Sequence, residues 1–213
     1  MARCTKEEAL ETRSRILDAA ESVFHANGVA RTSLADVAQA AGVTRGAIYW
    51  HFKNKSDLFD AMCERVRLPM EAMVAETSDE QAVDPLGQLR QTCIFIMRDT
   101  VNNPHLRKVL DILFHKCEYV DAADPIALRE LECFSQGTDN LERTLRNAVA
   151  KGQLPQDLDT RLASVVFHAS IDGLLNNWLF SPASFDLAGD AERLVDACLE
   201  TLRNAPSLRR NKN

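Results

Sequence analysis

Hydrophobic residues recur along this chain three and four positions apart, which is the spacing of a helix face. The first such face is formed by Ile16, Ala20, Val23 and Phe24. Upstream of it, Thr5 and Glu8 have the spacing of a capping box, in which each side chain accepts a hydrogen bond from the other residue's backbone amide. Gly28 stands where a left-handed residue ends a helix. The pattern predicts a first helix from Thr5 to Gly28.

Two shorter apolar repeats follow. The first repeat consists of Leu34, Val37, Ala38 and Ala41. Thr32 or Ser33 can cap it, and Gly42 breaks it. Thr44 can cap a third helix that reaches about His51. Two short helices joined by a tight glycine turn form a helix-turn-helix, whose second helix enters the major groove of DNA.

Longer amphipathic segments fill the rest of the chain. They predict a helix that starts at Lys55 and runs through Leu58 to about Val74. Further helices are predicted from Pro85 to just before Asn102, from Pro104 to about Tyr119, from Pro125 to near Gly152, from Asp157 to Phe180, and from about Leu187 to Asn204. The polar stretch Thr77–Val83 predicts a loop, and no run of alternating β-branched residues predicts a strand. We therefore expect an all-α protein of about nine helices, with three in an N-terminal helix-turn-helix domain.

Charge is distributed unevenly along the 213 residues. Residues 1–55 hold eight Lys and Arg against six Asp and Glu, a net +2, so the −6 of the whole chain leaves −8 for residues 56–213. A mildly basic head on an acidic body suits contact with DNA phosphates at one end. We expect a DNA-binding domain over residues 1–55 and a larger helical ligand-binding and dimerisation domain over residues 56–213.

The composition bears on where the protein is located and on what its cysteines do. No stretch approaches the roughly 18 apolar residues of a membrane span, and the N-terminus has no apolar signal core. A cytoplasmic protein without a membrane partner is expected. Six cysteines occur without a C-x-x-C pair, so neither a zinc site nor a disulfide framework is indicated. Buried, reduced thiols are the preferred interpretation, and a redox-sensing role for an exposed thiol stays open.

The predicted third helix has two different faces. Ala47 and Ile48 can pack inward, whereas another face carries Arg45, Gly46, Tyr49 and Trp50. A glycine inside a helix costs about 1 kcal/mol relative to alanine. Its lack of a side chain would permit close approach to a DNA backbone.

These residues resemble a known family. The run Val43–Lys55, VTRGAIYWHFKNK, closely resembles the signature of the TetR family of bacterial repressors, and Thr32–Ala38 matches it too. Four further segments resemble the AcrR/TtgR-like subgroup, which represses multidrug efflux pumps: residues 5–9, 115–118, 151–155 and 172–174.

The resemblance implies a set of DNA-contacting residues. They are Ser33, Thr44, Arg45, Gly46, Tyr49, Trp50, His51, Lys53 and Lys55. Thr44 offers a hydroxyl and a helix N-terminus to a phosphate, and Arg45 can reach a guanine edge. Tyr49 and His51 resemble the phosphate-contacting pair of the family. The alternative is that Tyr49 and Trp50 form a small core with Phe52, and for Phe52 itself the core position is preferred.

The resemblance also implies an apolar ligand cavity within the larger domain. Its expected lining is Val66, Ile96, Leu110, Leu113, Phe114, Phe134, Leu141, His168, Ile171, Asp172, Leu175 and Asn176. Each apolar member fits plain core packing equally well. Asp172 is costly on an apolar helix unless it is paired, so it bonds either a ligand or a neighbouring helix. It shares a helix face with His168, but no further metal ligand is evident, and we expect neither a metal nor a cofactor.

The last two helices are the expected homodimer surface. The apolar residues concerned are Val165, Val166, Ala169, Leu174, Leu175, Trp178, Leu179, Leu194, Cys198, Leu199 and Leu202. The resemblance thus implies a repressor of a multidrug efflux operon that binds double-stranded operator DNA as a dimer and is released by hydrophobic or aromatic inducers. A trigger such as a fatty acyl metabolite is the alternative. An enzyme fits badly, because no nucleophile elbow, phosphate loop or metal cluster is found.

Overall fold

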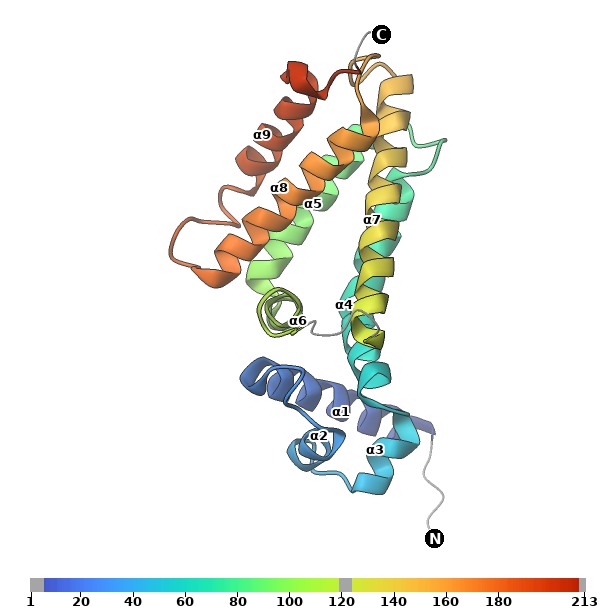
Figure 1. The fold of residues 1–213 in the computed structure, drawn as a ribbon, viewed down its shortest axis with the longest axis vertical. Helices are drawn as coiled ribbons and strands as arrows, with labels where there is room; N and C mark the ends of the chain where they lie inside the picture. Colours follow the sequence, from blue (N-terminus) through green and yellow to red (C-terminus); the bar gives the residue numbers. More distant parts are fainter. Residues whose placement is uncertain (1–5, 119–123, 211–213) are drawn as a thin grey trace. The chain divides into compact units, whose positions relative to one another are not determined.

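In the computed structural model, which describes residues 6–118 and 124–210, every regular element is a helix (Figure 1). The helices are α1 (Lys6–Asn27), α2 (Leu34–Ala40), α3 (Arg45–His51), α4 (Lys55–Thr77), α5 (Pro85–Asn102), α6 (Pro104–His115), α7 (Pro125–Ala150), α8 (Thr160–Phe180), α9 (Ala191–Asn204) and the short 3-10 helix η1 (Pro206–Leu208). One isolated antiparallel bridge joins Leu158 to Arg209. The expectation of an all-α chain of about nine helices is confirmed for the described residues.

The chain forms two compact units. The first comprises Met1–Arg67 and His105–Glu130, and the second comprises Leu68–Pro104 and Leu131–Asn213. The first unit therefore contains α6 and the start of α7 as well as α1, α2 and α3. The expected functional division at residues 55 and 56 falls inside this unit, and it stays a prediction.

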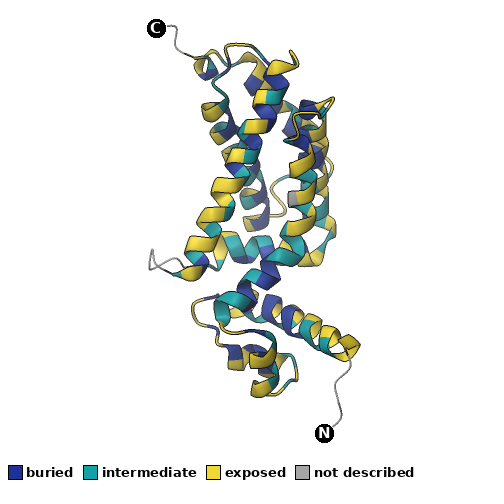
Figure 2. Cartoon of the chain, turned by 90° about the vertical axis from the view of Figure 1, so that its right-hand side faces the viewer, coloured by how far each residue is buried: buried dark blue, intermediate teal, exposed yellow. Residues whose placement is uncertain are grey.

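A shared apolar core holds the first unit together. Its fully buried members include Ile16, Ala20 and Phe24 of α1, Val37 of α2, Ile48 of α3, Leu58, Phe59 and Met62 of α4, and Val109 and Ile112 of α6. Phe24 and Phe59 meet edge to face, with ring centroids 5.9 Å apart. Buried and exposed residues lie on different sides of α1 (Figure 2). The predicted apolar faces of α1 and α2 are thus the faces that pack.

The connections around α2 and α3 follow the predicted turn chemistry. Gly28 and Gly42 have φ of 80° and 64°, the left-handed region that favours glycine. Ser33, rather than Thr32, caps α2: its hydroxyl accepts from the amide of Asp36. Thr44 caps α3 by accepting from the amide of Ala47 at 3.2 Å. For α1, the predicted capping box includes Thr5, which lies outside the described residues.

Charged pairs link α5 to α9 within the second unit. Arg90 donates two hydrogen bonds to Asp196, at 2.6 and 2.9 Å, and Arg98 pairs with Glu192 at 2.9 Å. Beneath them lies a core that includes Leu89, Ile94 and Met97 of α5, Ala163, Phe167 and Leu175 of α8, and Val195, Leu199 and Leu202 of α9. The buried faces of α5, α8 and α9 therefore pack against one another within one chain.

Three helix boundaries differ from the prediction by several residues. α4 extends to Thr77, beyond Val74, because the Thr77 hydroxyl lies 3.0 Å from that of Thr144 on α7. α9 begins at Ala191 instead of Leu187, because Asp186 accepts from the amide of Gly189 and forms a turn there. α8 begins at Thr160 rather than Asp157, because Asp159 is the residue that caps it.

The predicted sixth helix is also too long. α6 ends at His115, and the carbonyl of Lys116 accepts from the amide of Val29 at 3.0 Å. The predicted end at Tyr119 lies outside the described residues. The end of α6 is therefore fixed by a contact with the connection between α1 and α2, which local sequence does not reveal.

Candidate nucleic-acid interface and ligand site

One face of α3 is open to solvent. Arg45 and Gly46 are exposed, the exposed fractions of Tyr49 and Trp50 are 48% and 74%, and Ile48 is fully buried. Phe52 is buried as well. The prediction that Ile48 packs inward is confirmed, and so is the core position of Phe52. Tyr49 and Trp50 are therefore not core residues, and an Arg, a Gly and two aromatics form one accessible surface.

The side chains of this surface contact each other. The guanidinium of Arg45 lies over the Tyr49 ring, 5.8 Å from its centroid. A Cβ added to Gly46 would come no closer than 3.9 Å to the Thr44 hydroxyl, which is an ordinary contact. Since the free protein has room for alanine at this position, the fold itself does not require the glycine.

His51 sits in a cationic, partly buried setting. Burial of the imidazole lowers the pKa of His51, and the positive charge of Arg13 lowers it further. Trp50 meets the ring edge to face at 4.6 Å between centroids. Arg13, on α1, stacks over Phe52 at 5.2 Å. Arg13 was missed at the sequence level because nothing local shows that α1 brings it to α3.

The two predicted lysines differ in their surroundings. Lys53 is exposed. Lys55 is half-buried, and its ammonium donates to the carbonyls of Val29 at 2.9 Å and Ala30 at 3.1 Å. Lys55 thereby ties the start of α4 to the connection between α1 and α2. A phosphate contact by Lys55 would use its remaining N–H group.

Ser33 is exposed, but its hydroxyl is engaged with Asp36. It accepts from the Asp36 amide and donates to the carboxylate at 2.7 Å. Hydrogen bonds from the Ser33 side chain and then from its backbone lower the pKa of Asp36. Any phosphate contact at Ser33 would have to compete with this capping box.

The expected ligand residues are divided between the two units. Val66, Leu110, Leu113 and Phe114 belong to the first unit. The second unit holds Ile96, Phe134, Leu141, His168, Ile171, Asp172, Leu175 and Asn176. Leu141, Ile171 and Leu175 are buried in the core of their unit. Three of the expected residues, Phe134, His168 and Asp172, are brought together by α7 and α8.

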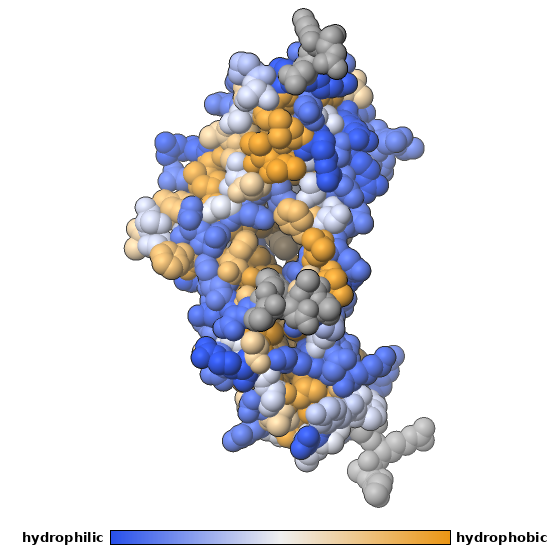
Figure 3. Space-filling model, in the orientation of Figure 1, coloured by the Kyte–Doolittle hydropathy of each residue, from blue (hydrophilic) through white to orange (hydrophobic). Residues whose placement is uncertain are grey.

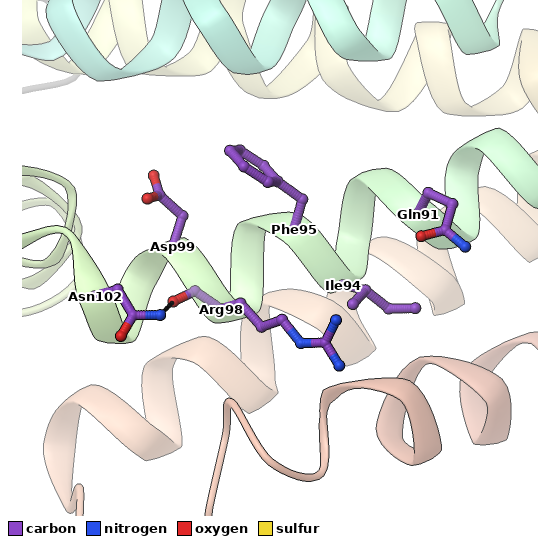
Figure 4. A pocket seen from close by; sticks show the side chains of 6 residues that line it. All are labelled: Gln91, Ile94, Phe95, Arg98, Asp99 and Asn102. Carbon is purple, nitrogen blue, oxygen red and sulfur yellow. Dashed lines mark hydrogen bonds between the residues drawn. The ribbon is translucent and has the colours of Figure 1, made fainter.

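An open groove of about 310 Å³ lies along α5 (Figure 4). Its lining consists of Gln91, Ile94, Phe95, Arg98, Asp99 and Asn102. Phe95 and Asp99 project from one side of the helix and Arg98 from another (Figure 4). None of these residues was expected from the sequence, because helical periodicity does not show which side of α5 is left uncovered. A second cavity, of about 560 Å³, is strongly charged, and Arg161 within it already pairs with Asp139 and Glu142.

Three possible metal ligands converge in the first unit. Asp18 and Glu21 of α1 and His105 of α6 place one ligand atom each within 4.8 Å of the others. Arg65 already bonds Asp18 at 2.7 Å, and His105 bonds the buried Glu21 at 2.6 Å. These contacts explain the buried carboxylate of Glu21, which links α1 to α6.

Three of the described cysteines, Cys63, Cys93 and Cys198, are poorly placed for redox chemistry. Burial raises the pKa of Cys63, and it raises that of Cys93 to about 12. The pKa of the half-buried Cys198 is raised for the same reason. A raised pKa lowers the fraction of reactive thiolate. Cys4 lies outside the described residues.

An apolar face of α8 is exposed within the second unit. Leu162, Val165 and Phe180 are 43%, 49% and 82% exposed, and apolar patches interrupt the polar surface of this unit (Figure 3). On α9, by contrast, Leu199 and Leu202 are buried within their own chain. The predicted dimer surface is thus wrong for five residues that pack inside their own subunit: Leu175, Trp178 and Leu179 of α8 and Leu199 and Leu202 of α9.

Two family models match this chain. Residues 16–62 match the model for bacterial regulatory proteins of the tetR family. Residues 84–204 match the C-terminal region of MAATS-type transcriptional repressors. Among the described residues, no helix combines the length and apolar character needed to cross a bilayer.

Individual proteins resemble it along nearly the whole chain. The HTH-type transcriptional regulator TtgR of Pseudomonas putida is 43% identical over 210 residues, 99% of this chain and 100% of TtgR. NalD, the secondary repressor of the MexAB-OprM multidrug efflux pump in Pseudomonas aeruginosa, has a TM-score of 0.81 at 35% identity, covering 94% of this chain and 100% of that one. The complex of SmeT with triclosan has a TM-score of 0.83 at 34% identity, with 95% and 96% covered; SmeT is a Stenotrophomonas maltophilia repressor.

An α3 that is exposed on one face and braced by α2 defines a helix-turn-helix DNA-binding protein. The family matches and the identity to TtgR make the assignment more specific. The chain belongs to the TetR family of bacterial transcriptional repressors. The resemblance stated from Val43–Lys55 is confirmed.

Proposed function

We propose that this repressor binds operator DNA as a homodimer, releases it when a hydrophobic or aromatic small molecule binds, and controls a multidrug efflux pump operon in the cytoplasm. The exposed surface of α3 carries the DNA-binding part, because it presents a guanidinium and two aromatic rings beside a glycine. NalD is a repressor of an efflux pump and SmeT is known with triclosan bound, which supports the ligand part. The function is binding, without turnover of the ligand.

In this proposal, ligand and DNA favour different conformations of one dimer. A ligand shifts the balance only by its differential affinity for the two states. α4 is the proposed lever, since it starts at Lys55, beside the helix-turn-helix, and continues past Val66 into the second unit. The exposed face of α8 is the proposed centre of the dimer surface, because Leu162, Val165 and Phe180 leave an apolar stripe uncovered.

Binding of a labelled promoter fragment from upstream of its own gene tests this function. Fluorescence anisotropy gives the Kd for DNA with and without triclosan. A coupling of about 1–3 kcal/mol would raise this Kd by about 5- to 150-fold. Asp172→Ala is expected to change the triclosan response while leaving the DNA affinity of the free protein within about twofold.

Two results would contradict the proposal. If the purified protein bound no DNA fragment from its own locus, repression at that locus would be contradicted. Intact DNA binding that triclosan and other aromatics leave unaltered, but that a fatty acyl compound abolishes, would replace efflux control with metabolite sensing.

A further inference from the structure

Where α1 passes the end of α3 (Figure 1), it places a guanidinium against the residue that follows α3. The guanidinium of Arg13 lies over the ring of Phe52, 5.2 Å from its centroid. Phe52 is buried, and its backbone amide donates to the carbonyl of Ile48 in the last turn of α3. A cation–π contact leaves most N–H groups of a guanidinium for other acceptors. Arg13 therefore brings a charge and hydrogen-bond donors from α1 to α3.

Arg13 differs from the other arginines that contact α1 or belong to it. Arg65 of α4 pairs with Asp18 of α1 at 2.7 Å. Arg15 donates to the carbonyl of Ala41 at 3.2 Å. Among the described residues, no carboxylate pairs with Arg13. A guanidinium that the fold does not pair is suited to an anion from outside the chain.

Arg13 has cationic and titratable neighbours at this position. His51 is the last residue of α3, and its ring centroid is 6.2 Å from that of Phe52. Burial lowers the pKa of His51, and the positive charge of Arg13 lowers it further, so the two side chains are close enough to interact. Lys53, two residues further on, is exposed. Positive charges that gather in one place repel each other, and an anion between them removes that repulsion.

We propose that Arg13 and His51 together hold one backbone phosphate of the operator, so that α1 takes part in DNA binding. This inference rests on the proposed function and extends the proposed DNA interface beyond residues 33–55. A guanidinium can donate a pair of parallel N–H bonds to phosphate oxygens, which fixes the orientation of the phosphate. The imidazole supplies a further donor. Phosphates carry no sequence information, so Arg13 strengthens binding to every DNA sequence.

The contact with Phe52 prepares Arg13 for this role. A long side chain loses rotamer freedom when it is fixed on a ligand, and that loss weakens binding. Arg13 is half-buried, and its guanidinium already lies against a ring that is 1% exposed. Part of the ordering therefore accompanies folding, and less of it remains for the step in which DNA binds.

Fluorescence anisotropy on the full chain, with the promoter fragment of its own gene at several salt concentrations, tests the inference. Arg13→Gln should bind at least about tenfold more weakly. The slope of the logarithm of the binding constant against the logarithm of the salt concentration should become shallower by about one per subunit, the value for one lost phosphate contact. An unrelated fragment of the same length should lose affinity by a similar factor. Arg146→Gln is the matched control, because it removes the same charge from an exposed arginine of α7 and should keep the parental slope.

Arg13→Lys separates a phosphate contact from a packing role. Lysine keeps the positive charge, so it should restore the parental slope and bring the affinity to within about threefold of the parent. If Arg13 acted only by packing on Phe52, both substitutions would weaken binding and neither would change the slope. Arg13→Gln combined with His51→Gln should weaken binding by less than the product of the two single effects, because both remove contacts with the same phosphate.

The outcomes separate this inference from the function beneath it. Parental affinity and slope in Arg13→Gln, or a weaker complex with an unchanged slope in both Arg13→Gln and Arg13→Lys, overturn the phosphate contact and leave the repressor function intact. Single effects that multiply in full would overturn the shared phosphate. If the parent protein binds no fragment from its own locus, the proposed function is contradicted, and this inference with it.

Discussion

The residues of α3 differ in how much they contribute to the fold. Thr44 and Ile48 build the helix, one as its cap and the other as its buried anchor. Gly46, Tyr49 and Trp50 make no comparable contribution to the fold, because they are exposed. Exposed residues that the stability of the fold does not explain are candidates for binding, which supports the proposal that this helix contacts DNA.

Gly46→Ala separates an effect on stability from an effect on DNA binding. The new Cβ has room in the free protein, so the free energy of unfolding should rise by up to about 1 kcal/mol, since alanine is the better helix former. The same methyl group would occupy space that the proposed interface reserves for DNA, so affinity should fall at least about tenfold. Urea denaturation and DNA-binding anisotropy measure the two effects. A variant with parental DNA affinity would show that Gly46 does not approach the duplex.

His51 is expected to make DNA binding sensitive to pH if it contacts a phosphate, as proposed. Because the pKa of His51 is lowered, folding favours the neutral imidazole. The stability that the neutral imidazole contributes is therefore complete above the ordinary pKa of 6.5, and it is lost as the pH falls below that value. A DNA phosphate beside the ring favours the imidazolium, so binding takes up a proton. DNA affinity should therefore rise as pH falls from about 8 to about 6, by at most about tenfold per unit, the limit for one proton. His51→Gln should remove that part of the slope; an identical pH profile would contradict a phosphate contact by His51.

At the scale of helices, the sequence predicts a boundary well where a cap or turn beside it sets that boundary, as around α2 and α3. Gly28, Ser33 and Thr44 act on their immediate neighbours, so the spacing of residue types was sufficient to place the turns around α2 and α3. The end of α6 depends on a carbonyl contact with Val29, which is far away in sequence. The groove on α5 was missed for a similar reason, because the exposure of Phe95 is decided by which neighbouring helices cover α5.

Ser33→Ala tests the cap of α2. Loss of the hydroxyl leaves a helix amide without its partner, so the protein should lose about 1 kcal/mol of stability. Ser22→Ala is the matched control, since the Ser22 hydroxyl donates to the Asp18 carbonyl within α1 and caps nothing. Urea unfolding of both variants gives the comparison. Equal midpoints for the two variants would show that the capping box is dispensable.

Val165→Asp tests the exposed face of α8. Val165 is 49% exposed within its own chain, so the subunit should stay folded while the proposed dimer dissociates. Val83→Asp makes the same chemical change at an exposed residue between α4 and α5, and it should leave the dimer intact. Light scattering after size-exclusion chromatography reports the mass. A Val165→Asp protein that still runs as a dimer would place the interface elsewhere.

At the scale of the whole molecule, residues 1–55 carry a net charge of +2 and residues 56–213 carry −8, which suits the proposed contact with DNA at one end of the chain. The family, the fold class and the exposed aromatic face of α3 could be predicted from the sequence, because Val43–Lys55 combines a turn, a cap and two neighbouring aromatics in one short run. The proposed ligand site stays a prediction. Its side chains come from several helices, and only Phe134, His168 and Asp172 are brought into one described cluster.

The central claim is that the exposed side chains of α3 hold the DNA. Its most direct test is the affinity of Tyr49→Ala for the promoter fragment of its own gene, beside Phe95→Ala, which truncates an equally exposed aromatic on α5. Loss of a charge-assisted contact of about 1.5 kcal/mol or more predicts at least a tenfold weaker complex for Tyr49→Ala, and an unchanged one for Phe95→Ala. Parental affinity in a folded Tyr49→Ala protein would contradict the claim.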